Sequence, residues 1–274
     1  MARIDLPASM ERIDFPQEVW AWLDLLGDVV VVTQQEALAH DETFLADTAY
    51  KQVLVRSVNR DVSTLSAIYV LLRCEFIHQA AAHVRLLCEA LITISYISRD
   101  PTGRVPLFSD YAAIDEFRVV SALLEWERQT AKPELVTWLD NHLSELRPNY
   151  DRLHRKYSSR RPRNWCNATV RSQAEESDLQ KLYETVYGQM SAYVHGSAWS
   201  LRRQIAYSRK HHDPRVVQAD VAIIVRTTIV VWLEWAQFAD RELGWSLLEK
   251  GGAIGSRCDA LDAEQFPANW PLGA

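Results

Sequence analysis

A tyrosine, a serine and a histidine follow one another at intervals of four residues, as Tyr187, Ser191 and His195, and Gly196 comes directly after the histidine. Residues four apart on an α-helix lie on the same face, and a glycine is typical of the residue that ends a helix. A histidine changes charge near neutral pH and can move protons, while the tyrosine and the serine can hold its tautomer. His195 is therefore the strongest single candidate for a catalytic group.

A second polar pair, Arg85 and Glu89, stands four residues apart within the apolar segment 80–92. Burying a lone charge is costly, so the two should pair with each other or with polar groups of another helix. One interpretation is a structural ion pair that fixes helix register. The other is a site in which Arg85 holds a phosphate and Glu89 orients it or acts as a base. The functional interpretation predicts one polar centre built from Arg85, Glu89, Tyr187, Ser191 and His195.

Serine and histidine side chains that merely adjoin on one helix do not predict a serine hydrolase. Nothing around Ser191 and His195 indicates a strained nucleophile turn or an oxyanion hole. A histidine at a helix C-terminus can also simply bond the last carbonyls, which requires no substrate.

A basic stretch follows position 158 and ends on an aromatic residue: Arg160, Arg161, Arg163 and Trp165. Arginines can track a phosphate backbone, and a tryptophan can stack on a base. These four residues are the predicted nucleic-acid contacts. The alternative is a solvated basic turn.

A metal site is the rival hypothesis from a different class. Glu75 and His78 have the Glu-x-x-His spacing of helical di-iron proteins, and Glu89 would lie on nearly the same face further along. Such a site would bind iron or another divalent metal. A complete one needs a second pair, for which Asp151 and His154 are only an approximate match, so the preferred interpretation uses no cofactor.

The composition describes a globular protein with reduced thiols. The chain has 274 residues, 48% of them hydrophobic and 24% charged, with a net charge of −6. That balance argues against broad electrostatic binding of nucleic acid but leaves room for a local basic patch. The four cysteines form no CxxC pair, and the amino terminus has no apolar signal, so we expect a cytoplasmic protein. Arg226, Glu234 and Gln237 interrupt the longest apolar run, which favours a buried helix over a membrane span.

Apolar residues recur at helical spacing along most of the chain and predict an all-α single bundle domain of about seven helices. The expected helices cover 16–40, 61–98 with a break near 75–79, 109–126, 133 to a kink or end at Pro148, 172–195 and 216–243. Residues 100–103 are predicted to form a turn. The predicted organisation is an N-terminal helical segment over 1–60, a core over 61–250 and an irregular tail over 251–274.

The segment around Arg85 and Glu89, then Trp165, then Tyr183, Tyr187, Ser191 and His195-Gly196-Ser197, resembles the bacterial domain-of-unknown-function family 5677 over roughly residues 63–200. The resemblance implies an all-helical architecture in which Arg85, Glu89, Ser191 and His195 converge. Helical HEPN ribonucleases are similar in kind, since they cleave RNA with an arginine followed a few residues later by a histidine. The residues before His195 depart from that pattern. Arg73 with His78 and Arg147 with His154 fit only its bare spacing.

Together these observations predict a nucleotide- or RNA-directed hydrolytic effector of a bacterial stress or defence system, acting without metal. The first alternative is the metal-dependent oxidoreductase. The second is a non-enzymatic interaction protein, because the ten tryptophans provide large packing surfaces and favour a homo-oligomer such as a dimer. We expect no membrane partner.

Overall fold

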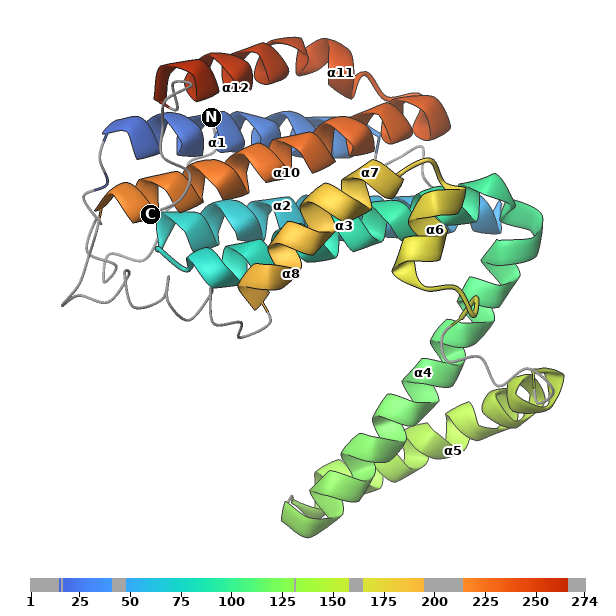
Figure 1. Cartoon of the computed structure of the whole chain (residues 1–274). Helices are drawn as coiled ribbons and strands as arrows, with labels where there is room; N and C mark the ends of the chain where they lie inside the picture. The colour runs from blue at the N-terminus through green and yellow to red at the C-terminus, as the bar shows by residue number, and fades with distance from the viewer. Residues whose placement is uncertain are drawn as a thin grey trace. The chain divides into compact units, whose positions relative to one another are not determined.

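The computed structural model describes residue 15 and residues 17–40, 48–130, 132–157, 165–194 and 214–265 (Figure 1). No described residue lies in a strand, which confirms the predicted all-α bundle. The long helices are α1 (Gln17–Ala39), α2 (Ala49–Arg73), α3 (Ile77–Arg99), α4 (Pro101–Thr130), α5 (Pro133–Lys156) and α10 (Pro214–Leu243). The shorter ones are α6 (Val170–Glu176), α7 (Gln180–Leu182), the π-helix η2 (Tyr183–Tyr187), α8 (Gly188–Val194), α11 (Leu247–Lys250) and α12 (Gly252–Gln265).

The chain forms two compact units. The first comprises residues 1–95 and 174–274, and the second comprises residues 96–173. The structure thus divides inside the predicted core of residues 61–250, and it does not separate residues 1–60 from the residues that follow them.

Tryptophans organise the core of the first unit, where α1 packs against α2, α10 and α12. Trp22, Trp232 and Trp235 are fully buried. Each indole N–H donates a hydrogen bond to a residue of another helix. Trp22 donates to Gln265 Oε1 at 2.9 Å, Trp232 to Thr33 Oγ1 at 2.9 Å and Trp235 to Asp61 Oδ2 at 3.2 Å. A buried tryptophan needs this one bond satisfied, so the three bonds fix how the helices face one another.

The predicted break between α2 and α3 is confirmed, and its geometry explains it. Glu75 has a positive φ of 58°. The Glu75 amide donates to the Leu72 carbonyl at 3.0 Å, and the Phe76 amide donates to the Leu71 carbonyl at 2.9 Å. This is a Schellman C-cap with a glutamate where glycine is usual.

Three predicted boundaries of the middle and C-terminal segments are wrong. Residues 101–103 belong to α4, because the Asp100 carboxylate accepts the Gly103 amide at 3.0 Å and caps the helix. The predicted 172–195 helix begins at Val170 and is interrupted after Glu176, where Asp178 has φ 60°. The predicted irregular tail contains α12, which packs on α1 and α10.

The second unit is built on a hairpin in which α4 and α5 run antiparallel (Figure 1). Pro133 opens α5, as predicted. Pro148 does not end it, and α5 continues to Lys156. Phe117 of α4 stacks on Tyr150 of α5 with ring centroids 4.0 Å apart, and the Lys156 ammonium and the Tyr157 hydroxyl each donate to Asp110 at 2.7 Å.

Two described helices are long and apolar enough to cross a membrane by length and composition, namely α3 and the stretch Val216–Leu243 of α10. In each, most of the apolar window is buried inside the protein, as in a core helix.

Candidate functional site

Arg85 and Glu89 lie on α3 at the border of its buried face. Ala81, Val84 and Cys88 of that face are fully buried. Arg85 and Glu89 themselves are half-buried. A long charged side chain at such a border can bury its stem while keeping its polar end accessible to solvent or to a ligand.

Tyr187, at the end of η2, lies between the two charges. Arg85 Nη2 donates a hydrogen bond of 2.8 Å to the Tyr187 hydroxyl, and the guanidinium carbon lies 4.8 Å from the centre of the same ring. The hydroxyl in turn donates to Glu89 Oε2 at 3.5 Å. We call Arg85, Glu89 and Tyr187 the α3–η2 polar centre. Of the five residues predicted to form one polar centre, the structure brings these three into contact.

Glu89 is the least constrained member of the α3–η2 polar centre. Within the part of the chain that the structure describes, its carboxylate accepts only the long bond from Tyr187. A half-buried carboxylate gains from better donors, because burial without hydrogen bonds is unfavourable. The arrangement can thus accept a donor hydrogen from a ligand while Arg85 holds a neighbouring anionic group.

The π-helix shapes the side of the site that faces α3. Tyr183 and Tyr187 stack with centroids 5.0 Å apart and planes 20° from parallel. π-helical turns are rare and often occur at functional sites. Ser191, on α8, donates to the Tyr187 carbonyl at 2.7 Å. This is the bond to the carbonyl four residues earlier that serine often makes within a helix, and among the described residues no contact joins Ser191 to Arg85 or Glu89.

His195 lies outside the described residues, and it directly follows Val194, the last residue of α8. Arg160, Arg161 and Arg163 also lie outside them. These four assignments stay predictions.

Trp165 is described and belongs to the second unit. Its ring makes edge contacts with Tyr96 and Phe108, at centroid distances of 5.8 and 5.2 Å. Trp165 is half-buried in this aromatic cluster.

The three residues of the metal hypothesis, Glu75, His78 and Glu89, do not all lie on one helix. Glu75 occupies the left-handed turn after α2, and His78 lies in the first turn of α3, where its ring meets the edge of Tyr193 at 5.9 Å. Glu89 lies three turns further along α3, beside Tyr187. Among the described residues, no three histidine, cysteine or acidic side chains gather closely enough to hold a metal ion.

The residues that only fit the HEPN spacing take part in packing. The Arg73 guanidinium lies 5.2 Å from the centre of the Trp20 ring, and that of Arg147 lies 5.2 Å from the centre of Phe117. Neither belongs to the α3–η2 polar centre.

Sequence reasoning missed Asp61, a carboxylate of α2 that is 1% exposed. Burial raises its pKa to about 6, although the neighbouring Arg60 and the bond from Trp235 favour its ionised form. A usable signal exists, since Asp61 falls on the same helical stripe as Leu54, Val58, Leu65 and Leu72.

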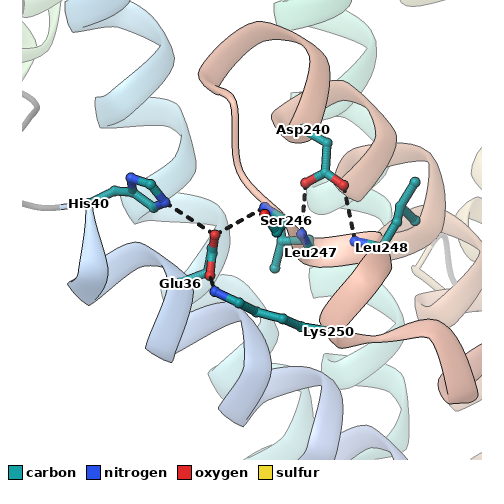
Figure 2. Close-up of polar contacts among 7 residues, drawn as sticks. All are labelled: Glu36, His40, Asp240, Ser246, Leu247, Leu248 and Lys250. Atoms are coloured by element: carbon teal, nitrogen blue, oxygen red, sulfur yellow. Dashed lines mark hydrogen bonds and ion pairs between the residues drawn. The ribbon is translucent and has the colours of Figure 1, made fainter.

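A second missed carboxylate is Glu36, near the end of α1 (Figure 2). It accepts hydrogen bonds from His40 Nε2 at 3.2 Å, from the Ser246 amide at 3.0 Å and from the Lys250 ammonium. Burial opposes its ionisation, but these donors prevail and hold the pKa of Glu36 below its usual value. The donors come from the residue that follows α1, from α11 and from the turn before α11, so Glu36 links that turn to α1.

The comparisons with known proteins fit the family suggested by the sequence. No curated protein and no solved structure is significantly similar to the chain. The family of unknown function DUF5677 matches residues 51–212, which is more than half of the chain and includes all of the α3–η2 polar centre. The chain therefore belongs to the DUF5677 family.

Proposed function

We propose that the protein is a nucleotide- or RNA-directed hydrolytic effector whose active centre is the α3–η2 polar centre together with Ser191 and His195. The observation that supports this proposal is the Tyr187 hydroxyl, which is held between the Arg85 guanidinium and the Glu89 carboxylate. Because the Tyr187 hydroxyl separates the two charges, the guanidinium and the carboxylate can bind different groups of one substrate.

Arg85 supplies the phosphate contact. A guanidinium stays charged at all working pH values and bonds two oxygens of a phosphate with its planar donor fork. The Tyr187 ring fixes the plane of that fork through the cation–π contact at 4.8 Å. A single fixed donor of this kind contributes roughly 10²–10³ in rate when it meets charge that develops in the transition state.

Glu89 and His195 supply proton transfer in this proposal. The Glu89 carboxylate takes the proton of the attacking hydroxyl or water, and His195 gives one to the oxygen that leaves phosphorus. Each step of this kind contributes roughly 10²–10⁴ in rate. Ser191, whose hydroxyl donates to the Tyr187 carbonyl, is the remaining residue of the proposed centre.

The proposed setting is a bacterial cytoplasm, where such a protein acts in stress or defence responses. All four cysteines fall within the described residues and none forms a disulfide, which fits a reducing compartment. The basic residues Arg160, Arg161 and Arg163, with Trp165, provide an additional nucleic-acid contact in this proposal. A metal-independent ribonuclease of HEPN type is its most specific form.

The test is hydrolysis by the purified full-length protein, with single-stranded RNA and nucleoside triphosphates as separate substrates and with EDTA present. We expect turnover of one of these substrates and its loss in Arg85→Ala. The matched control is Arg56→Ala, which changes an exposed arginine on α2 of the same unit. No turnover of either substrate, or equal turnover in the two variants, would refute the proposal.

A non-enzymatic interaction protein is the second candidate, and one observation favours it. Five of the exposed large apolar side chains lie on the α4–α5 hairpin. Exposed apolar patches commonly mark protein contacts.

A further inference from the structure

An apolar strip lies on the surface of the α4–α5 hairpin. On α4, Val119, Leu123 and Trp126 are 65%, 43% and 67% exposed. On α5, Leu135 and Trp138 are 41% and 59% exposed. The spacing of four and three residues on α4, and of three on α5, places each set on one face of its helix.

On α4, the strip lies away from the face that contacts α5. Phe117 and Leu124 are buried on α4, and Leu139 is buried on α5. At about 100° of rotation per residue, Val119 and Trp126 lie roughly 140–180° from Phe117 and Leu124, and Leu123 lies roughly 100–120° from them. On α5, Leu135 lies only about 40° from Leu139, so there the strip borders the face that contacts α4.

One ion pair shows that the two halves of the strip share a side of the hairpin. Glu116 Oε1 of α4 lies 3.6 Å from His142 Nε2 of α5. Leu123 is two turns after Glu116, and Leu135 is two turns before His142, so the antiparallel arrangement places these leucines opposite each other. Trp138 stacks on the His142 ring at 5.4 Å and continues the strip along α5.

The area of the strip matches what a small symmetric interface requires. Two tryptophans with about three fifths of their surface exposed, and three half-exposed aliphatic side chains, present on the order of 400 Å² of apolar area. An interface at the low end of the specific range buries about 600 Å² per partner, and about 65% of a homodimer interface is apolar. The strip alone therefore provides close to the required apolar core.

We propose that this strip is the homodimer interface, and that its occupant is the same strip on a second copy of the chain. Two antiparallel helices bury one face of each helix, and a second hairpin across a two-fold axis completes a four-helix bundle. An apolar strip of this kind can pack against the same strip across a two-fold axis, and charged side chains such as Glu116 would then form part of a polar rim. The inference goes beyond the proposed function and does not depend on it.

The test is sedimentation equilibrium of the full-length protein. At roughly 100 μM, where a dimer with a micromolar Kd is almost fully formed, we expect the wild type to have the dimer mass. We expect the double variant Val119→Glu/Trp138→Glu to be monomeric, with Kd raised at least roughly 100-fold by the charges placed in a desolvated interface. The matched control Leu38→Glu, which changes an apolar residue of α1 that is 74% exposed, should remain dimeric.

A monomeric wild type, a double variant that stays dimeric, or a control that also dissociates would each overturn the proposal. Circular dichroism establishes that the variants fold. A second measurement needs no variant: hydrogen exchange of the wild type should slow within residues 119–138 as its concentration rises through Kd. Exchange that is independent of concentration would contradict the interface.

Discussion

The phenol of Tyr187 is the residue on which the candidate site depends. Its hydroxyl accepts from Arg85 at 2.8 Å and donates to Glu89 at 3.5 Å, so it partly satisfies two half-buried charges. We expect Tyr187→Phe to lower the free energy of unfolding by about 1–2 kcal/mol, because both charges lose a hydrogen-bond partner. Urea denaturation monitored by circular dichroism measures the change.

Tyr183→Phe is the matched control for that change. Tyr183 stacks on Tyr187, but its hydroxyl bonds none of the residues that the structure describes. Its variant should unfold at the same urea concentration as the wild type. If both variants lost the same stability, the hydroxyl of Tyr187 would not be what links Arg85 and Glu89.

Asp61 gives the fold a distinct pH dependence. Its pKa is about 6 in the folded protein against an ordinary 3.8, because burial favours the neutral acid. Its contribution to stability is therefore complete below 3.8 and is lost as the pH rises to about 6. The Asp61→Asn variant keeps a neutral side chain and avoids this loss.

We compare the free energies of unfolding of Asp61→Asn and the wild type at two pH values. The difference, variant minus wild type, should increase by about 1–2 kcal/mol from roughly pH 5 to roughly pH 7.5. Urea denaturation at both pH values tests this. Asp24→Asn, at an exposed position of α1, should show no such change. A difference between Asp61→Asn and wild type that stays constant with pH would mean that Asp61 is not buried as a neutral acid.

At the scale of elements, Asp240 secures the short helix α11 (Figure 2). Its two carboxylate oxygens accept the amides of Leu247 and Leu248 at 2.8 and 3.0 Å. We expect Asp240→Ala to cost about 1–2 kcal/mol, as loss of a helix cap does, and to speed hydrogen exchange at these two amides. Asp259→Ala, on the exposed face of α12, should leave both amides protected. Unchanged exchange in Asp240→Ala would rule out the cap.

Pro148 lies inside α5, where a proline removes a backbone hydrogen bond and clashes with the preceding turn. Replacing it with alanine should stabilise the second unit by about 1–3 kcal/mol. Thermal denaturation measures the effect. Pro133→Ala is the control, because the first position of a helix does not use its amide, and it should change little. A loss of stability in Pro148→Ala would show that α5 needs the proline.

The sequence predicted the long helices well and their ends poorly, for a physical reason. Apolar spacing identified α1, α3 and α10 because each buries a wide stripe. The ends depend on single residues instead. Asp100 converts a predicted turn into a capped helix start. Glu75 and Asp178 adopt left-handed conformations, which aspartate tolerates better than most residues and glutamate does not favour.

At the scale of the whole molecule, the convergence of Arg85, Glu89 and Tyr187 was predictable, whereas the two units were not. Arg85 and Glu89 stand out because they lie on an otherwise apolar helix, where burial requires polar partners such as Tyr187. The division at residues 96 and 173 depends on which helices pack with one another, and the sequence has no linker-like segment that marks it. The long-range bonds from Trp22 and Trp232 likewise join segments that are 243 and 199 residues apart, respectively.

The most direct test of catalysis at the α3–η2 polar centre is an activity assay of the Glu89→Gln variant. The rates at which this variant hydrolyses RNA and nucleoside triphosphates are compared with those of the wild type. The change removes a proton acceptor but keeps the size of the side chain, which makes one long hydrogen bond to the residues that the structure describes. We expect a rate roughly 10²–10⁴ times lower than wild type with an unchanged unfolding midpoint, while Glu234→Gln, on the exposed face of α10, should retain full activity. A Glu89→Gln protein that hydrolyses either substrate at the wild-type rate would contradict the role proposed for Glu89.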